Sequence, residues 1–269
     1  STTIKNNTIS NNRYSIYLEN SNNRFAVGQV QAVKYIDSLP YTINQSGYYV
    51  LNKSFTDFNP SDYGVNYAIK INASNVTLDG NGNTIDGIRY NNYCIYARSL
   101  INVTIMNITI KEWNTGIYLC NVNYGKIVNS SISWSKYGVY LYNSGNVTIL
   151  NNTISENLKN NIISKNNIPY NPAGMTLYNS NNNTIENNLL LNNYDGYSIY
   201  LDHSNNNKFI NNILFNEYYG WYFGRGIVLQ SSDYNIFINN TVNGSKYYGF
   251  YISSNHNTLI GNNISKSKY

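Results

Sequence analysis

Apolar and polar residues alternate along most of this chain in short phrases that recur. Residues 137–155 read YGVYLYNSGNVTILNNTIS, and closely related phrases occupy 115–133, 197–215 and 225–243. Each phrase contains two short runs in which every second residue is apolar, separated by a few Asn, Ser or Gly residues. A period of two indicates β-strands, and self-similarity at a fixed interval indicates a repeat architecture.

The repeats can be aligned on one apolar position in their second run. The constant unit is about 22 residues long, and longer intervals contain insertions such as 157–172. In the first run of each unit two apolar residues lie two positions apart, as Ile117 and Leu119 do. The aligned residues, at spacings of 22, 22, 36, 24, 28 and 22, are Ile105, Ile127, Ile149, Ile185, Phe209, Phe237 and Leu259.

A strand of four or five residues cannot bury its apolar face alone, so each must stack on its equivalent in the next unit. The period is too short for a propeller blade, and the return segment IxNNTIS is a strand pattern rather than the helical segment of a leucine-rich repeat. The sequence therefore predicts an all-β fold, a right-handed parallel β-helix (solenoid) of about 22-residue rungs. With rungs about 4.8 Å apart, eight of them would form a rod roughly 40 Å long.

In six of the seven aligned units an Asn lies two residues after the aligned apolar position. Asn tolerates the left-handed backbone conformation of a turn, and stacked amides can hydrogen-bond along the axis. Gly261 takes this place in the last unit and suits the same turn. We therefore expect a buried Asn ladder made of Asn107, Asn129, Asn151, Asn187, Asn211 and Asn239.

Two stretches carry a family resemblance. SGYYVLNKSF (46–55) followed by NASNVTLDGNGNTIDG (72–87) looks like the usual entrance to a right-handed parallel β-helix, and GIYL…NVTIxNNTIS units follow it. In these features the chain resembles the group of carbohydrate-binding proteins and sugar hydrolases that includes NosD-like and surface-layer-associated proteins. The resemblance covers most of the chain and implies the fold. It leaves the function open, because this architecture hosts lyases, hydrolases, epimerases, adhesins and structural proteins.

The chain starts with a complete repeat unit that stands apart from the others. The pattern breaks over residues 26–62, which we interpret as a connector and entrance cap, so 1–25 is predicted to be an isolated rung and 63–269 the β-helix. The residues of the first rung that match later units are Ile4, Asn6, Ile9, Ile16 and Leu18.

This first rung could be donated to a neighbouring subunit. If residues 1–25 stack on the C-terminal rung of another copy, next to Leu259 and Ile264, the contact is head-to-tail and propagates as a filament. Two alternatives stay open: the chain begins at a cut within a longer β-helix, or residues 1–25 fold back on their own chain.

Composition narrows the partners. The formal charge of +5 is spread without runs of Lys or Arg, whereas nucleic-acid binding needs clustered positive charge. No stretch approaches 18 apolar residues, so no membrane span is predicted. Fourteen Asn-x-Ser/Thr sequons and a first residue other than Met favour an exported, extracellular or cell-surface glycoprotein. We expect glycans at turn or loop sequons such as Asn44, Asn146 or Asn243, and none at the ladder positions.

One outward position of the first run is tyrosine in most units. Tyr is a good exposed strand residue, so propensity alone can explain this. The alternative is an aromatic strip that binds sugars or packs against another protein. The residues of this predicted binding strip are Tyr17, Tyr96, Tyr118, Tyr140, Tyr200 and Tyr251.

Catalytic candidates are few. Glycoside hydrolysis needs two carboxylates about 5 to 10 Å apart, but Asp202 is expected to lie between Tyr178 and Gln230, with no stacked carboxylate. The best constellation gathers in three successive turns, and its alternative is ordinary solvated side chains. Its members are Asp195, Asp202, His203, Glu217 and Arg225.

Cysteine and histidine usage predicts no metal or cofactor. The chain has two Cys and two His, without C-x-x-C or H-x-x-x-H spacing. Cys94 and Cys120 fall on adjacent rungs but four positions apart along the strand, about 13 Å. A disulfide needs a separation below about 7 Å, so free thiols are expected.

The sequence thus predicts a protein that is not an enzyme. It favours an exported structural or surface β-helix protein that self-assembles head-to-tail into an extracellular filament or surface layer. Its expected partners are copies of itself and glycans. The alternatives are a polysaccharide lyase or hydrolase on a β-helix scaffold, or a glycan-binding adhesin.

Overall fold

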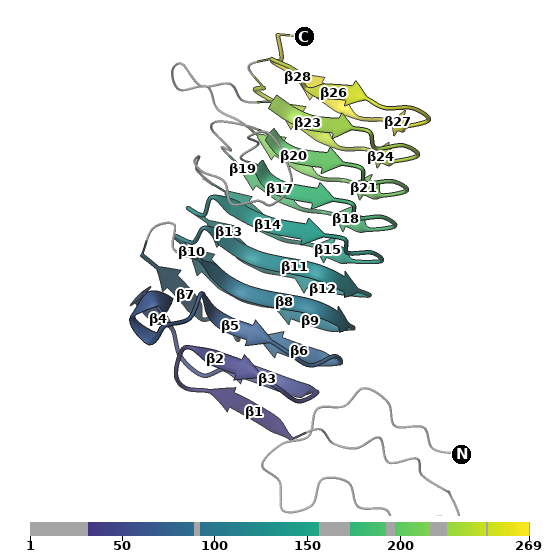
Figure 1. Cartoon of the computed structure of the whole chain (residues 1–269). Coiled ribbons are helices and arrows are strands. Elements are labelled where there is room, and N and C mark those ends of the chain that lie inside the picture. Colours follow the sequence, from purple (N-terminus) through teal and green to yellow (C-terminus); the bar gives the residue numbers. More distant parts are fainter. Residues whose placement is uncertain are drawn as a thin grey trace, which may run out of the picture.

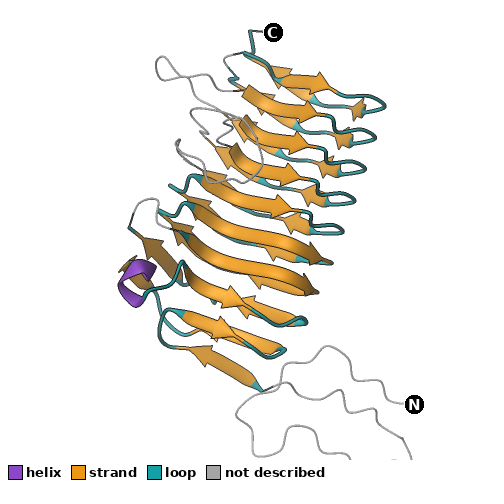
Figure 2. Cartoon of the chain, in the orientation of Figure 1, coloured by secondary structure: helices purple, strands orange, loops and turns teal. Residues whose placement is uncertain are grey.

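The computed structural model describes residues 32–88, 92–155, 173–191, 197–215, 225–245 and 247–268. In these residues short strands wind into rungs that stack along one axis, from β1 (Val33–Ile36) to β28 (Asn263–Ser265) (Figure 1). The described residues contain one short 3-10 helix, η1 (Pro60–Tyr63), and otherwise only strands and turns (Figure 2). The predicted all-β solenoid is confirmed.

A typical rung contributes one strand to each of three parallel sheets, which we name A, B and C. Sheet A contains, in order, β1, β3 (Gly47–Leu51), β6 (Val76–Asp79), β9 (Val103–Met106), β12 (Lys126–Val128), β15 (Thr148–Leu150), β18 (Thr184–Glu186), β21 (Lys208–Ile210), β24 (Ile236–Ile238) and β27 (Thr258–Ile260). Sheet B contains β2 (Tyr41–Ile43), β5 (Tyr67–Ile71), β8 (Tyr93–Ile101), β11 (Thr115–Asn123), β14 (Tyr137–Tyr142), β17 (Ala173–Tyr178), β20 (Tyr197–Asp202), β23 (Arg225–Gln230) and β26 (Phe250–Ser253). Sheet C contains β4 (Phe55–Phe58), β7 (Thr84–Gly87), β10 (Thr109–Lys111), β13 (Ser131–Ser133), β16 (Thr153–Ser155), β19 (Leu189–Leu191), β22 (Ile213–Phe215), β25 (Thr241–Asn243) and β28.

The predicted register is confirmed in sheet A. The aligned apolar residues pair directly from β9 to β27, beginning with Ile105 opposite Ile127 and ending with Phe237 opposite Leu259. From Ile105 to Phe237 these side chains are fully buried, so they form one continuous apolar core inside the solenoid. Stacked Phe209 and Phe237, with ring centroids 4.7 Å apart, show how closely equivalent side chains of successive rungs pack.

The solenoid begins earlier than the sequence boundaries suggest. Strands β1 to β4 lie within residues 26–62, which were predicted to be a connector and entrance cap, yet they pair in parallel with β3, β5, β6 and β7. Their longer and less regular connections hid the repeat. The predicted isolated rung at 1–25 lies outside the described residues.

The predicted Asn ladder needs a correction of one residue. The six predicted Asn residues do adopt the left-handed conformation, with φ between 51° and 56°. However, Asn107 is only half-buried, and Asn129, Asn151, Asn187, Asn211 and Asn239 are not buried in the core either. The turn at each of them points their own side chain outward and the next side chain into the core.

The ladder that is buried starts at Asn152. Each amide donates a hydrogen bond to the amide oxygen of the next rung, over 2.9 to 3.1 Å. Each oxygen also accepts from the backbone N–H one rung earlier, which satisfies a turn donor that would otherwise be buried without a partner. This first ladder consists of Asn152, Asn188, Asn212 and Asn240, which are buried, and of Asn262 in the last rung, which is half-buried.

Two further polar stacks line the turns between sheets B and A. In one, Asn183, Asn207 and Asn235 repeat the same amide-to-amide contacts at 3.0 Å. In the other, serine hydroxyls accept the backbone N–H of the preceding serine at 3.0 to 3.1 Å. The serines are Ser144, Ser180, Ser204 and Ser232. The high Asn and Ser content therefore has a structural role inside the solenoid.

Candidate functional site

The outer face of sheet B gathers many of the chain's tyrosines. Strand pairing places the predicted strip in one column, in which Tyr96, Tyr118 and Tyr140 are direct neighbours. The column continues through Thr176, Tyr200, Val228 and Tyr251. A second column starts at Arg98 and continues through Cys120, Tyr142, Tyr178, Asp202, Gln230 and Ser253.

The tyrosine column does not form a flat platform. Tyr96 and Tyr118 are stacked along the solenoid axis, with centroids 5.6 Å apart and an interplanar angle of 14°. Tyr93 packs against both at 5.0 to 5.2 Å, and Tyr118 contacts Tyr140 at 5.5 Å. Because the faces of these rings cover one another, the surface presents ring edges and hydroxyl groups. Ligand hydroxyls can therefore hydrogen-bond to this surface, whereas broad face-on stacking is restricted.

Burial extends the protonated form of four of these phenols to more alkaline pH. It raises the pKa of Tyr93 and Tyr137, and raises the pKa of Tyr118 and Tyr140 well above its ordinary value of 10.0. Neighbouring phenols and Cys120 contribute smaller increases to the pKa of Tyr118. At neutral pH this cluster supplies hydrogen-bond donors and no tyrosinate base.

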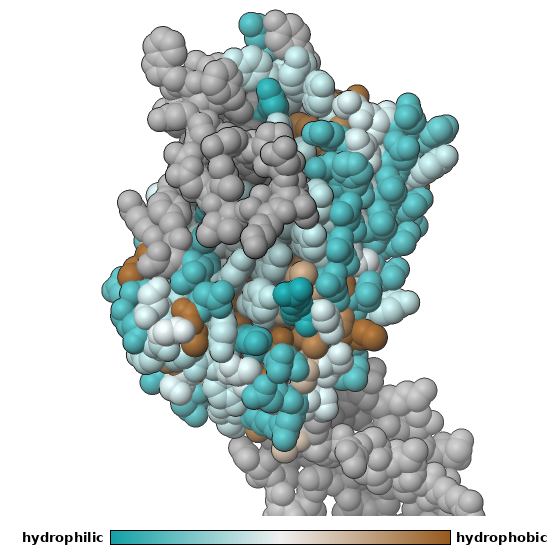
Figure 3. Space-filling model, in the orientation of Figure 1, coloured by the Kyte–Doolittle hydropathy of each residue, from teal (hydrophilic) through white to brown (hydrophobic). Residues whose placement is uncertain are grey.

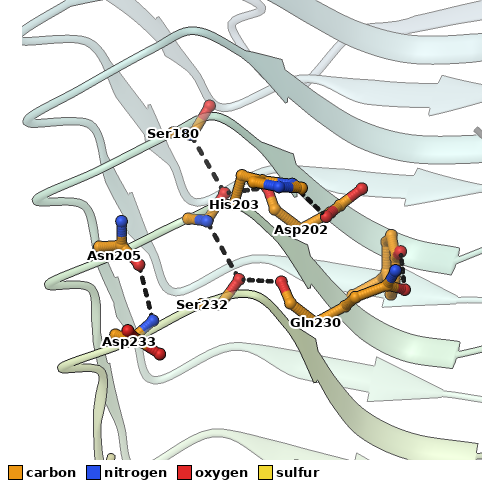
Figure 4. Close-up of polar contacts among 9 residues, drawn as sticks. Ser180, Asp202, His203, Asn205, Gln230, Ser232 and Asp233 are labelled. Atoms are coloured by element: carbon orange, nitrogen blue, oxygen red, sulfur yellow. Dashed lines mark hydrogen bonds and ion pairs between the residues drawn. The ribbon is translucent and has the colours of Figure 1, made fainter. Parts of the chain in front are cut away.

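The second column contains a carboxylate–imidazole pair. His203 Nδ1 lies 2.6 Å from Asp202 Oδ1, and Figure 4 shows the ring against the carboxylate at the end of β20. The Asp202 side chain is 8% exposed and that of His203 is 59% exposed, so the buried carboxylate orients an imidazole that reaches solvent. With Asp202 ionised, His203 Nδ1–H donates to it and Nε2 is available to accept a proton.

Two other polar contacts lie on the same face. The Tyr200 hydroxyl donates to Gln230 Oε1 at 3.0 Å. Gln230 lies on β23, one rung beyond Asp202. Arg225 donates to the Tyr197 hydroxyl at 2.8 Å, and its guanidinium carbon lies 5.3 Å from the centre of that ring. Arg225 pairs with Tyr197, at the opposite end of β20 from Asp202, so it does not join the predicted constellation around that carboxylate.

The other predicted residues are scattered. Asp195, Glu217 and Tyr17 lie outside the described residues, as do the predicted assembly residues Ile4, Asn6, Ile9, Ile16 and Leu18. Leu259 and Ile264 in the last rung are 39% and 46% exposed. Asn44 and Asn146 are exposed, and Asn243 is half-buried with its amide oxygen buried. Cys94 and Cys120 are free and buried.

Of the cations that accompany the tyrosines, only Arg225 was given a candidate role from the sequence. Lys70 and Arg98 lie on the same face of sheet B, on β5 and β8. The available signal was the register, which aligns Lys70 with the tyrosine column and Arg98 with the Asp202 column. Figure 3 shows this side of the molecule as mostly pale and teal, with few brown patches among the described residues.

A comparison with protein families matches residues 67–226 to the family described as the right handed beta helix region. This match spans more than half of the chain and agrees with the parallel sheets. The chain belongs to the right-handed β-helix family. A comparison with curated proteins finds no significant match.

Solved structures share this β-helix. One is a mutant of DFA-IIIase from Arthrobacter chlorophenolicus A6 in complex with DFA-III, at 13% identity and a TM-score of 0.60; the match covers 81% of this chain and 53% of that one. Another is a mutant of the periplasmic alginate epimerase AlgG, at 15% identity and a TM-score of 0.56, covering 80% of this chain and 49% of that one. The β-helix protein thus spans about half the length of these proteins, and the likeness concerns the fold.

These neighbours correct one prediction. The chain was expected not to be an enzyme, because its sequence shows no pair of stacked carboxylates. This expectation is contradicted, since the matched structures are enzymes on the same scaffold. Among the described residues, no helix of this β-helix protein is long and apolar enough to cross a membrane.

Proposed function

We propose that this β-helix protein is a carbohydrate-acting enzyme whose substrate lies along the outer face of sheet B. The observation that carries the proposal is the Asp202–His203 pair beside a strip of tyrosine hydroxyls. The sugar-active β-helix enzymes among the solved structures support the same class of substrate. This proposal replaces the structural filament as the main function.

The Asp202–His203 pair is suited to acid–base catalysis. The exposed imidazole can take a proton from a sugar carbon or hydroxyl, or from water, while Asp202 holds its tautomer and stabilises the imidazolium that forms. Asp202 is the only carboxylate on the described strands of sheet B, so these strands offer no second carboxylate for a two-carboxylate hydrolysis. Asp233 lies in the turn of the next rung, where its carboxylate accepts from the Asn255 backbone N–H at 2.7 Å. Elimination fits the arrangement better than hydrolysis: His203 takes a proton from the sugar carbon, and the imidazolium that forms returns it to the glycosidic oxygen that leaves as the double bond forms. Epimerisation would need, besides this base, a donor such as a tyrosine hydroxyl that returns a proton to the opposite face of the ring.

The tyrosines would bind the sugar. Tyr118 and Tyr140 lie on successive rungs, with Tyr142 beside them in the second column, and an extended glycan that follows the solenoid axis would meet one rung after another. The hydroxyl groups of Tyr118 and Tyr140 are protonated at neutral pH, as tyrosine hydroxyls ordinarily are, so they can donate to glycan oxygens. An exported location agrees with this substrate and with the periplasmic epimerase that shares the fold. Head-to-tail assembly through residues 1–25 stays a prediction.

The test uses the chain's two histidines as a matched pair. His203 and His256 both have positive φ values, 49° and 55°, and Asn accepts this conformation readily. We expect His203→Asn to lower kcat on the polysaccharide that the wild type converts by about 100-fold or more, the range for a positioned acid–base group. His256→Asn, whose ring lies against Tyr234, should leave the rate unchanged.

The reaction would be followed on neutral and acidic polysaccharides by new reducing ends, by ultraviolet absorbance of unsaturated products and by NMR for epimerised units. A wild-type rate retained in folded His203→Asn would refute the role of the imidazole. Glycan binding without conversion of any polymer in the panel would instead favour an adhesin.

A further inference from the structure

Charge is unevenly distributed over the three sheets. The described strands of sheet B carry three cations, Lys70, Arg98 and Arg225, and one carboxylate, Asp202. The described strands of sheet C carry one lysine and two aspartates, and those of sheet A carry three lysines and two carboxylates. Asp202 is in contact with His203, and within the described residues no carboxylate lies within ion-pair distance of Lys70 or Arg98. The proposed sugar-binding face therefore has an excess of positive charge.

Two of these cations are held against tyrosine rings. Lys70 Nζ lies 6.0 Å from the centre of the Tyr67 ring, and the guanidinium carbon of Arg225 lies 5.3 Å from the centre of the Tyr197 ring. Such contacts limit the motion of long side chains, which lowers the entropy lost when a ligand binds. Arg98 itself is exposed, so its guanidinium is accessible. The Nε of Arg225 is buried with no hydrogen-bond partner.

Arg98 also has a fixed position relative to the candidate catalytic pair. It stands in the same column as Asp202, four rungs away, with Cys120, Tyr142 and Tyr178 between them. At about 4.8 Å per rung the separation is roughly 19 Å. A rung is comparable in length to one sugar unit of an extended chain. A short stretch of glycan with one end at His203 would thus have its other end at Arg98 and Lys70.

We infer that the substrate is an anionic polysaccharide that runs parallel to the solenoid axis, with an acidic group bound by Arg98 and Lys70 when another unit lies at His203. The anion is a sugar carboxylate or a sulfate ester, since a guanidinium binds both through paired hydrogen bonds. This inference rests on the proposed function, and it names the substrate class and a subsite remote from the reacting unit.

Binding can be measured apart from turnover in the His203→Asn protein. The probes are polygalacturonate with its carboxyl-reduced form, and dextran sulfate with dextran, so each anionic polymer has a neutral counterpart. We expect one anionic polymer to bind at least about tenfold more tightly than its counterpart, with affinity falling as NaCl is added. Which pair shows the difference identifies the anion.

Arg98→Gln should remove most of this preference, and Arg98→Lys should restore part of it. The matched control is Lys126→Gln, which removes the same charge from an exposed position on sheet A. Equal binding of anionic and neutral polymers would refute the inference while leaving the proposed acid–base pair intact. So would an equal loss of binding in Arg98→Gln and Lys126→Gln, because attraction would then follow net charge alone. A protein that binds the anionic polymer through Arg98 but converts no polymer would refute the proposed reaction and not the subsite.

Discussion

Replacing Asn188 by Ala tests the buried Asn ladder directly. The Asn188 amide donates to the Ile149 carbonyl at 2.9 Å and to Asn212 Oδ1 at 3.0 Å. Its oxygen accepts from the backbone N–H and the amide of Asn152, at 3.0 and 3.1 Å. Asn152 and Asn188 are both buried, so water cannot replace these partners in the intact rung.

The expected loss follows from what the substitution leaves unpaired. The Asn152 backbone N–H would lose its acceptor, which costs about 1–3 kcal/mol for a buried group. In the other three hydrogen bonds the group left behind keeps another partner or is a carbonyl oxygen with a second lone pair. Each of these bonds should therefore contribute about 0.5 kcal/mol, the lower end of the usual net value of about 0.5–1.5 kcal/mol. We expect Asn188→Ala to lower the free energy of unfolding by about 2.5–4.5 kcal/mol, the sum of these contributions.

The neighbouring residue provides the control. Asn187 is exposed with φ of 54°, so Asn187→Gly keeps the turn conformation and removes an amide outside the ladder. Urea unfolding should be followed both by circular dichroism and by tryptophan fluorescence, because a solenoid can unfold in parts and buried Trp113 reports on the N-terminal rungs. An Asn188→Ala loss below about 0.5 kcal/mol, or one no larger than that of Asn187→Gly, would show that the ladder assignment is wrong.

Two further predictions concern buried titratable groups on sheet B. The folded state keeps the Tyr140 proton above pH 10, whereas the unfolded chain releases it there, so the free energy of unfolding should fall as pH rises beyond 10. Tyr140→Phe should make this fall shallower. Equal pH slopes in the two proteins would contradict the burial of Tyr140. Burial also raises the pKa of the Cys94 and Cys120 thiols. A thiol reagent should therefore modify Cys120 slowly and Cys94 only on unfolding, and rapid modification of both in the native protein would argue against this packing.

The strand register could be predicted because two independent periods agree. Alternation places the side chains of each strand, and the 22-residue interval places each strand on the next, so Ile105, Ile127 and Ile149 could only stack in one way. The insertion at 157–172 does not disturb this, since Ile185 restores the register. Strands β1 to β4 were missed because their spacing is irregular, although pairing with later rungs places them in the same sheets.

The Asn ladder was misplaced because both positions of the NN dipeptide carry Asn in most rungs. The first position is limited to Asn or Gly, as at Asn151 and Gly261, which is what a left-handed turn requires. The second position also accepts Ser130 and the buried Ile108, which indicates a side chain that points into the core. The left-handed turn therefore restricts which residues occur at the first position, and burial restricts which occur at the second. Comparing the two positions separately across the rungs would have placed the ladder at the second position.

The candidate site was harder to foresee because neighbouring residues in a strand point to opposite faces. Asp202 and His203 meet only because His203 follows β20 with a positive φ, which turns its ring back over the carboxylate. The same turn position in other rungs is occupied by Asn121, Asn143 and Asn179, all with positive φ. Asn therefore satisfies the backbone at this place, and the imidazole at 203 adds nothing that the turn needs. If His203 is present for its chemistry, His203→Asn should lower the free energy of unfolding by no more than about 1.5–3 kcal/mol, the usual contribution of a hydrogen bond to a charged group such as Asp202, while turnover falls by about 100-fold. A larger loss of stability would mean instead that the imidazole has a wider structural role.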